Sequence, residues 1–238
     1  MMKNAILITG AGRRVGHALA LHLHAQGHPV IAHFHHDNPE LERLRALGIP
    51  LLQADFSAEK SVLDLAHAVG SQCSSLRAIV HNASAFFATS SHTLEALEQF
   101  DLFYQIHMRS PYALTRTLTS HLRACTEPQA DILHITDIFA DRPNPRFDVY
   151  CASKAGLQNL ALSFAKSLAP KVKVNVIQPG PLLFKDWHSD EVKEQVLAET
   201  PLGREGGCEP ICLAVSAVLA NPYQTGAIIA VDGGRRLA

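Results

Sequence analysis

Seven short apolar runs recur along the 238-residue chain, and segments with the 3.6-residue period of amphipathic helices separate most of them. The runs are residues 5–9, 29–34, 49–54, 77–82, 131–136, 172–177 and 227–232. Strands that are apolar throughout and alternate with helices form parallel sheets with both faces covered. The alternation therefore predicts a single α/β domain over residues 1–238, built on a doubly wound parallel sheet of seven strands.

The region 181–210 breaks this alternation. It is rich in charge, proline and glycine, contains the lone Trp187, and has no strand-like apolar run. Long excursions at the ends of strands often cover binding sites. We therefore expect an insertion after the sixth strand that acts as a lid.

The composition favours a small-molecule partner. Twenty-one Lys and Arg residues against 22 Asp and Glu residues leave no net field that would attract nucleic acid or an anionic membrane. The five cysteines have no zinc-type spacing, so we expect free thiols and no metal. No apolar run is long enough to span a membrane and no signal pattern opens the chain, which predicts a cytoplasmic protein.

The stretch LITGAGRRVG, residues 7–16, places three glycines between the first strand and the first helix. A glycine-rich turn at this point brings backbone N–H groups and a helix N-terminus together, which makes an anion site. Two adjacent arginines, Arg13 and Arg14, suggest an anion with more charge than a plain pyrophosphate.

Further segments accompany this turn in a familiar order: HNAS at 81–84, YCASK at 150–154, QPGPL at 178–182 and VDGG at 231–234. With them the whole chain resembles the short-chain dehydrogenase/reductase family. Arg14 replaces the middle glycine of that family's turn, which resembles the pteridine reductase branch. The text SLAPKVKVN and His107 resemble the bacterial dihydromonapterin reductases within it. The resemblance implies a Rossmann-like fold, a nicotinamide cofactor and a homotetramer.

The resemblance also implies how the cofactor is held. Arg13 can meet a 2′-phosphate, and His35 and His36 can donate to one, whereas Asp37 would oppose it; NADPH is therefore favoured over NADH. Asp55 resembles an adenine-contacting acid, with a turn cap as the alternative. The expected cofactor-binding residues are Gly10, Gly12, Arg13, Arg14, Val15, His35, His36, Asp55, Phe56, Asn82, Ala83, Ser84, Tyr150, Lys154, Pro179 and Gly180.

The expected catalytic residues are Asp137, Tyr150, Lys154 and His107. Tyr150 and Lys154 lie four residues apart on one helix face, where the ammonium is expected to lower the pKa of the tyrosine. Asp137 stands thirteen residues before Tyr150, where most relatives carry a serine. An aspartate suits protonation of a ring nitrogen better than binding of a ketone. His107 replaces an asparagine that holds a relay water; its alternative role is that of a helix residue satisfied by a backbone carbonyl.

The substrate set that the resemblance implies is Arg14, Ser84, Phe86, Asp137, Tyr150 and Leu182. Phe86 would stack a pterin against the nicotinamide, or else it is a loop aromatic that covers the core. We therefore expect an NADPH-dependent reductase of dihydropterins, with dihydrofolate as a poorer substrate. The alternatives are a general carbonyl or 3-oxoacyl reductase of the same family, and a non-catalytic dinucleotide sensor.

The helix that carries Lys154 has an apolar stripe wide enough to serve both the core and a partner subunit. Its members are Leu157, Leu160, Ala161, Phe164 and Ala165. We expect this stripe to contribute to the homotetramer.

Overall fold

A computed structural model describes all 238 residues. Its seven strands form one sheet in the order β3-β2-β1-β4-β5-β6-β7, and every pairing is parallel. The strands are β1 (Ala5–Ile8), β2 (Val30–Phe34), β3 (Leu51–Gln53), β4 (Leu76–His81), β5 (Ala130–Ile135), β6 (Val172–Pro179) and β7 (Ile228–Val231). The predicted sheet is confirmed. The strand order reverses between β1 and β4, and ligands of such sheets bind at the carboxyl ends of the strands near this point.

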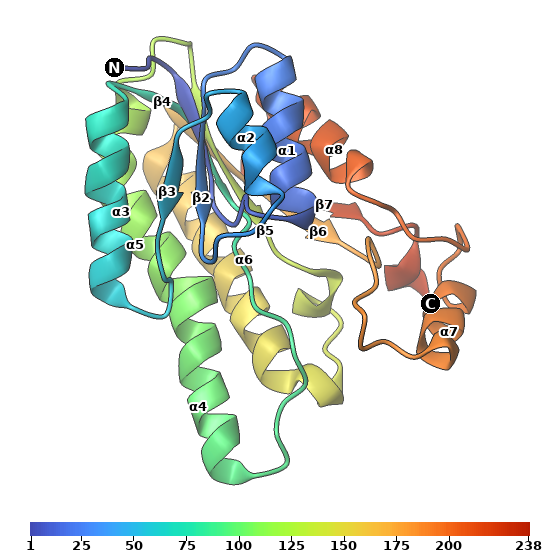
Figure 1. The fold of residues 1–238 in the computed structure, drawn as a ribbon. Coiled ribbons are helices and arrows are strands. Elements are labelled where there is room, and N and C mark those ends of the chain that lie inside the picture. Colours follow the sequence, from blue (N-terminus) through green and yellow to red (C-terminus); the bar gives the residue numbers. More distant parts are fainter.

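Helices cover both faces of the sheet (Figure 1). On one face lie α1 (Arg14–Ala25), α2 (Leu41–Ala46) and α8 (Glu209–Ala220), whose buried side chains share a core with β1, β2 and β4. On the other lie α3 (Glu59–Gln72), α5 (Ser110–Arg123) and α6 (Asp148–Leu168), around a second apolar core. A short π-helical segment, Gln105–Arg109, joins α4 (Thr93–Tyr104) to α5. No helix is long and apolar enough to cross a membrane.

Residues 181–210 contain no strand, and they run from the end of β6 to the start of α8. Their one complete helix is α7 (Asp190–Ala198). Ser189 caps its N-terminus, because its hydroxyl accepts a hydrogen bond from the Val192 N–H. Figure 1 shows α7 beside the C-terminus, away from the sheet. The absence of a strand here fits the predicted insertion, and its role as a lid stays a prediction.

The apolar stripe of α6 does not lie free on the surface. Leu157, Ala161, Phe164 and Ala165 are buried within the single chain, because α6 packs directly on the sheet. A cluster of large exposed apolar side chains lies instead on α4, at Leu94, Leu97, Phe100 and Tyr104. The stripe therefore serves the core, apart from the half-buried Leu160, and its contact with a partner subunit stays a prediction. Helix α4 offers a more exposed apolar surface.

Candidate active site

The glycine turn packs tightly against the end of β4. Gly10 has a φ of +68°, and a Cβ on it would lie 2.8 Å from the Cα of Ala83. A Cβ on Gly16 would lie 2.2 Å from the Gly10 carbonyl oxygen. The Asn82 side-chain amide donates to the carbonyls of Thr9 and Gly10 at 3.0 and 3.2 Å. Only glycine fits these two positions, and Asn82 braces the turn from the neighbouring strand.

Helix α1 begins at this turn with its N-terminus open. No side chain caps it and no acidic residue lies in its first turn. The first N–H groups of a helix have no partner within the helix, and its dipole favours negative charge there. The turn and the helix start therefore form a cradle that suits a phosphate.

The two arginines of the turn differ in conformation. Arg13 is exposed and extended, whereas Arg14 has a φ of +53°, in the left-handed region where glycine is favoured. The Arg14 guanidinium donates to the carbonyls of Leu183 and Phe184 at 2.6 and 3.4 Å. Arg14 was expected at the cofactor phosphate, but in this structure it ties the insertion after β6 to the glycine turn.

The turn after β3 lies on the other side of β2. Asp55 accepts hydrogen bonds from the N–H and the hydroxyl of Ser57, at 2.8 and 2.7 Å. These bonds hold the pKa of its carboxyl below the ordinary value. Asp55 therefore caps this turn, which was its alternative role. His35 Nε2 lies 3.6 Å from Asp55 Oδ1. The Phe56 side chain is buried in the core, so only its backbone could face a cofactor.

Asp37 does not stand alone near the predicted 2′-phosphate position. Its carboxylate is 2.8 Å from the guanidinium of Arg45 on α2. The neighbouring rings of His35 and His36 lie against each other, with centroids 3.7 Å apart. Because Arg45 pairs with the acid, the repulsion that Asp37 would exert on a phosphate is reduced.

The catalytic candidates meet where β5 ends and α6 begins. The Tyr150 hydroxyl donates to Asp137 Oδ2 at 2.9 Å, and the Phe139 N–H donates to Asp137 Oδ1 at 2.9 Å. Lys154 Nζ donates to the Ile135 carbonyl at 3.1 Å and lies 5.7 Å from the centre of the Tyr150 ring. The structure thus brings together the three residues that sequence spacing selected.

Burial sets the protonation of this group. It raises the pKa of Asp137, against the opposing effects of the Phe139 N–H, the Tyr150 hydroxyl and Lys154. Burial also lowers the pKa of Lys154 to about 8. The pKa of Tyr150 lies well above its ordinary value because of burial and the Asp137 carboxylate. The expectation that Lys154 lowers the pKa of Tyr150 is wrong here, and Tyr150 is a protonated donor.

His107 is buried beside this group, in the π-helical segment. Its Nε2 accepts from the Ala85 N–H at 3.2 Å and lies 2.9 Å from Ser84 Oγ. Its Nδ1 lies 2.7 Å from Ser153 Oγ, and that hydroxyl donates to the Tyr150 carbonyl. Protein groups therefore occupy both ring nitrogens. His107 links the turn after β4 to α6, and its role of holding a water stays a prediction.

Phe86 lies against the catalytic tyrosine. Its ring is 4.8 Å from that of Tyr150 and 4.7 Å from that of Phe147, centroid to centroid. Two residues of the insertion also contact Phe86. The Trp187 ring stacks on it with centroids 6.0 Å apart, and Lys185 Nζ donates to the Phe86 carbonyl at 3.0 Å. Sequence reasoning did not place Lys185 or Phe147 here, and neither belongs to a motif that would have indicated it.

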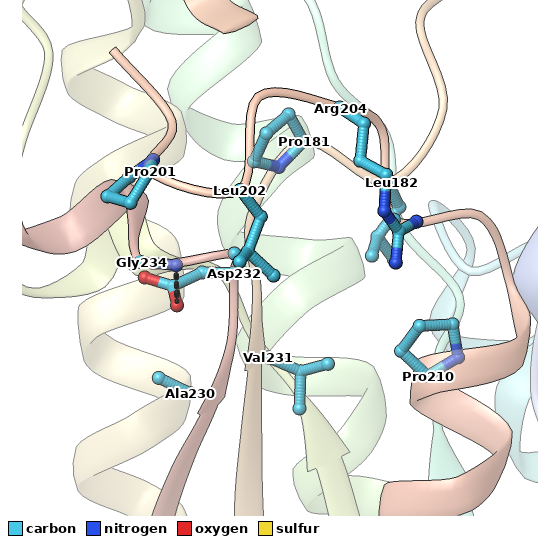
Figure 2. Close-up of a pocket in the computed structure, with 12 residues that line it drawn as sticks. Pro181, Leu182, Pro201, Leu202, Arg204, Pro210, Ala230, Val231, Asp232 and Gly234 are labelled. Carbon is cyan, nitrogen blue, oxygen red and sulfur yellow. Dashed lines mark hydrogen bonds between the residues drawn. The ribbon is translucent and has the colours of Figure 1, made fainter.

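Leu182 lines a cavity of about 450 Å³ between the insertion and the end of β7 (Figure 2). Figure 2 shows Leu202 and Pro201 on its other side, above the hydrogen bond from the Gly234 N–H to Asp232. Neither Tyr150 nor Asp137 lines this cavity. The substrate contact expected of Leu182 therefore has no support from its position.

Pro179 and Gly180, at the end of β6, pack against the end of the neighbouring strand β7. The Gly180 N–H donates to the Val231 carbonyl at 3.1 Å, and a Cβ on Gly180 would lie 2.7 Å from the Cα of Asp232. The Pro179–Gly180 step thus keeps the two strand ends together.

No group of three or more His, Cys, Asp or Glu side chains is placed to hold a metal ion.

Comparison with known proteins agrees with this arrangement. A short-chain dehydrogenase/reductase family model, described as enoyl-(acyl carrier protein) reductase, matches residues 10–236. Dihydromonapterin reductase from Klebsiella pneumoniae is 40% identical over 232 residues, which are 98% of this chain and 96% of the relative. Its counterpart from Escherichia coli is 38% identical over the same shares.

Among solved structures, FolM alternative dihydrofolate reductase 1 from Brucella canis, complexed with NADP, aligns with a TM-score of 0.88 and 29% identity. The alignment covers 99% of this chain and 94% of that one. The RhlG/NADP complex from Pseudomonas aeruginosa aligns with a TM-score of 0.87 and 26% identity, over 98% and 96% of the two chains. Given the family match over nearly the whole chain, and a Tyr150, Lys154 and Asp137 group at the carboxyl end of the sheet, the chain belongs to the short-chain dehydrogenase/reductase family.

Proposed function

We propose that this protein reduces dihydropterins with NADPH, most readily 7,8-dihydromonapterin to its tetrahydro form, with dihydrofolate as a poorer substrate. The observation that carries the proposal is the hydrogen bond from the Tyr150 hydroxyl to Asp137, beside the Phe86 ring. The relatives named dihydromonapterin reductase and the FolM dihydrofolate reductases support the substrate class.

The glycine turn fits the cofactor for two reasons. The lack of side chains at Gly10 and Gly16 allows a tight backbone turn, and the N-terminus of α1 beside it has no cap. When bound, NADPH supplies the hydride. The backbone of the turn would hold the pyrophosphate, and the exposed Arg13 would meet the 2′-phosphate. Lys154, next to Tyr150, would hold the nicotinamide ribose.

The protein's own part in the chemistry is the proton. Reduction of the N5=C6 bond adds a hydride to C6 and a proton to N5. Tyr150 is protonated, and Asp137 accepts its hydrogen bond while burial raises the pKa of the carboxyl. We infer that the proton reaches N5 through this pair, and that water restores it.

Two alternative functions, a carbonyl reductase and a non-catalytic dinucleotide sensor, can be distinguished from this proposal by experiment. A ketone or 3-oxoacyl reductase would need a neutral donor for the carbonyl oxygen where this chain has Asp137, and a silent sensor would not need a buried acid pair. Oxidation of NADPH, followed by absorbance, should be measured with dihydropterins, dihydrofolate and a panel of ketones and acyl thioesters. Turnover of dihydropterins is the expected result. Turnover of ketones alone, or of nothing, would overturn the proposal.

Replacing Arg13 by alanine should weaken NADPH binding without weakening NADH binding. The side chain is exposed beside the open start of α1, where it can pair with a 2′-phosphate that NADH lacks. A hydrogen bond between charged groups is worth enough to raise the Michaelis constant for NADPH about tenfold or more. Steady-state kinetics with both cofactors measures this. Arg43→Ala, at an exposed position of α2, is the control and should change neither constant. Equal losses with both cofactors would contradict the assignment.

We also propose a homotetramer, in which the exposed apolar face of α4 contacts another subunit. Burial of Leu97 and Phe100 in such an interface would remove large apolar side chains from water. The double substitution of both by glutamate should therefore give a smaller species in light scattering. Leu47→Glu, at the exposed end of α2, is the control. A 25.9 kDa monomer of the unaltered protein at micromolar concentration would contradict the proposal.

A further inference from the structure

His33, on β2, joins the two segments that flank the predicted cofactor site, although no catalytic step uses it. Its Nδ1 accepts from the Gly10 N–H at 3.0 Å, and its Nε2 lies 3.1 Å from the Ala54 carbonyl. Its own carbonyl accepts from the Ala11 N–H at 2.7 Å. One residue therefore holds both the glycine turn and the start of the turn after β3.

The hydrogen-bond partners define a single form of the ring. The Gly10 N–H is a donor, so Nδ1 must be unprotonated, and the Ala54 carbonyl is an acceptor, so Nε2 carries the hydrogen. The residue is only 2% exposed, and its ring stacks on Phe56 with centroids 4.3 Å apart and an interplanar angle of 13°. Burial lowers the pKa of His33 to about 4, so the ring is neutral at physiological pH.

The two segments are expected to face different parts of a bound dinucleotide. The glycine turn is the cradle for the pyrophosphate, and Asp55 and Phe56 follow Ala54 directly on the side expected to hold the adenine. A turn that is fixed before the ligand arrives loses less conformational entropy on binding. Resting on the proposed NADPH dependence, we propose that His33 is a positioning residue that fixes the pyrophosphate and adenine segments in their binding conformation.

The test is titration of NADPH and NADP into three variants, together with steady-state kinetics. His33→Phe keeps a flat ring against Phe56 but removes both hydrogen bonds. The loss of two neutral hydrogen bonds should raise the dissociation constant of NADPH about tenfold, with kcat at saturating NADPH changed less than about threefold. A role in the chemistry would instead lower kcat.

Two conservative variants separate the two contacts. In His33→Asn the amide oxygen can take the place of Nδ1 and accept from Gly10, and in His33→Gln the amide nitrogen can take the place of Nε2 and donate to Ala54. Each should recover part of the affinity lost in His33→Phe. These variants also keep the test valid if His33→Phe does not fold.

Val69→Ala is the matched control. Val69 is fully buried on α3, among core residues. Its truncation should lower the melting temperature through a cavity and leave the NADPH dissociation constant unchanged. If every His33 variant bound NADPH within about twofold of the unaltered protein, the inference would fail while the proposed function stood. If the unaltered protein did not bind NADPH, both would fail.

Discussion

Replacement of Asp137 by asparagine should lower kcat for dihydropterin reduction by about 10²–10⁴, with the Michaelis constant little changed. Asparagine keeps the size and polarity of the side chain, and its one amide oxygen can accept from Tyr150 or from the Phe139 N–H, where the carboxylate accepts from both. It cannot exchange a proton. The raised pKa of Asp137, caused by burial, is what allows the carboxyl to do so closer to neutral pH. Initial rates at saturating NADPH measure the effect.

Asp137→Ser should lose pterin reduction to a similar extent, because it restores the hydroxyl that most relatives carry and removes the ionisable group. NADPH binding should be preserved in both variants, since the Asp137 side chain makes hydrogen bonds only with the Tyr150 hydroxyl and the Phe139 N–H. Asp64→Asn, at an exposed site of α3, is the control. Near-normal rates in both Asp137 variants would make the residue structural and remove the main support for a pterin substrate.

The fold was predictable because it depends on local patterns. Five of the seven apolar runs form the central strands, which are buried on both faces, so they carry no polar alternation and stand out from the helices. The edge strands β3 and β7 are only partly buried. The order of the strands follows from right-handed crossovers and from the glycine turn at the end of β1. The Tyr150 and Lys154 pair was predictable for the same reason, since one helix fixes the geometry of residues four apart.

The rest of the site depends on contacts between distant residues, which no local pattern carries. Arg14 bonds to Leu183 and Phe184, some 170 residues further along the chain. His33 resembles its neighbours in sequence, yet it alone is buried between two turns. The pKa of Tyr150 was predicted in the wrong direction because spacing reveals the nearby lysine but not the degree of burial.

Lowering the pH from 8 to 5 should destabilise the fold steeply, because four buried histidines resist protonation. Burial lowers the pKa of His33 to about 4 and that of His134 to about 3, and holds those of His81 and His107 well below the ordinary value. Neighbouring groups lower these pKa values further. Lys154 lowers the pKa of His107 and of His134, and His35 lowers that of His33.

The direction follows from proton binding. Below about pH 6.5 the unfolded chain protonates these histidines and the folded chain does not, so the free energy of unfolding falls with pH. The decrease continues until the folded pKa values are reached, near 4 for His33 and near 3 for His134. Each group contributes at most about 1.4 kcal/mol per pH unit, and the four together lower the free energy of unfolding by about 8 kcal/mol between pH 8 and pH 5. Since domains are stable by about 5–15 kcal/mol, we expect unfolding near pH 5 in urea titrations followed by circular dichroism.

His134→Phe tests the cause. Neither ring nitrogen of His134 has a hydrogen-bond partner, and its ring stacks on that of His81 with centroids 4.7 Å apart. Phenylalanine keeps the stack and removes the unpaired polar atoms, so the variant should be about 1–3 kcal/mol more stable at pH 8. Its advantage should grow towards pH 5, because one of the four groups no longer binds a proton on unfolding. His92→Gln, at an exposed position, should leave the pH dependence unchanged. An unaltered protein equally stable at pH 8 and pH 5 would show that these histidines are solvated or protonated in the fold.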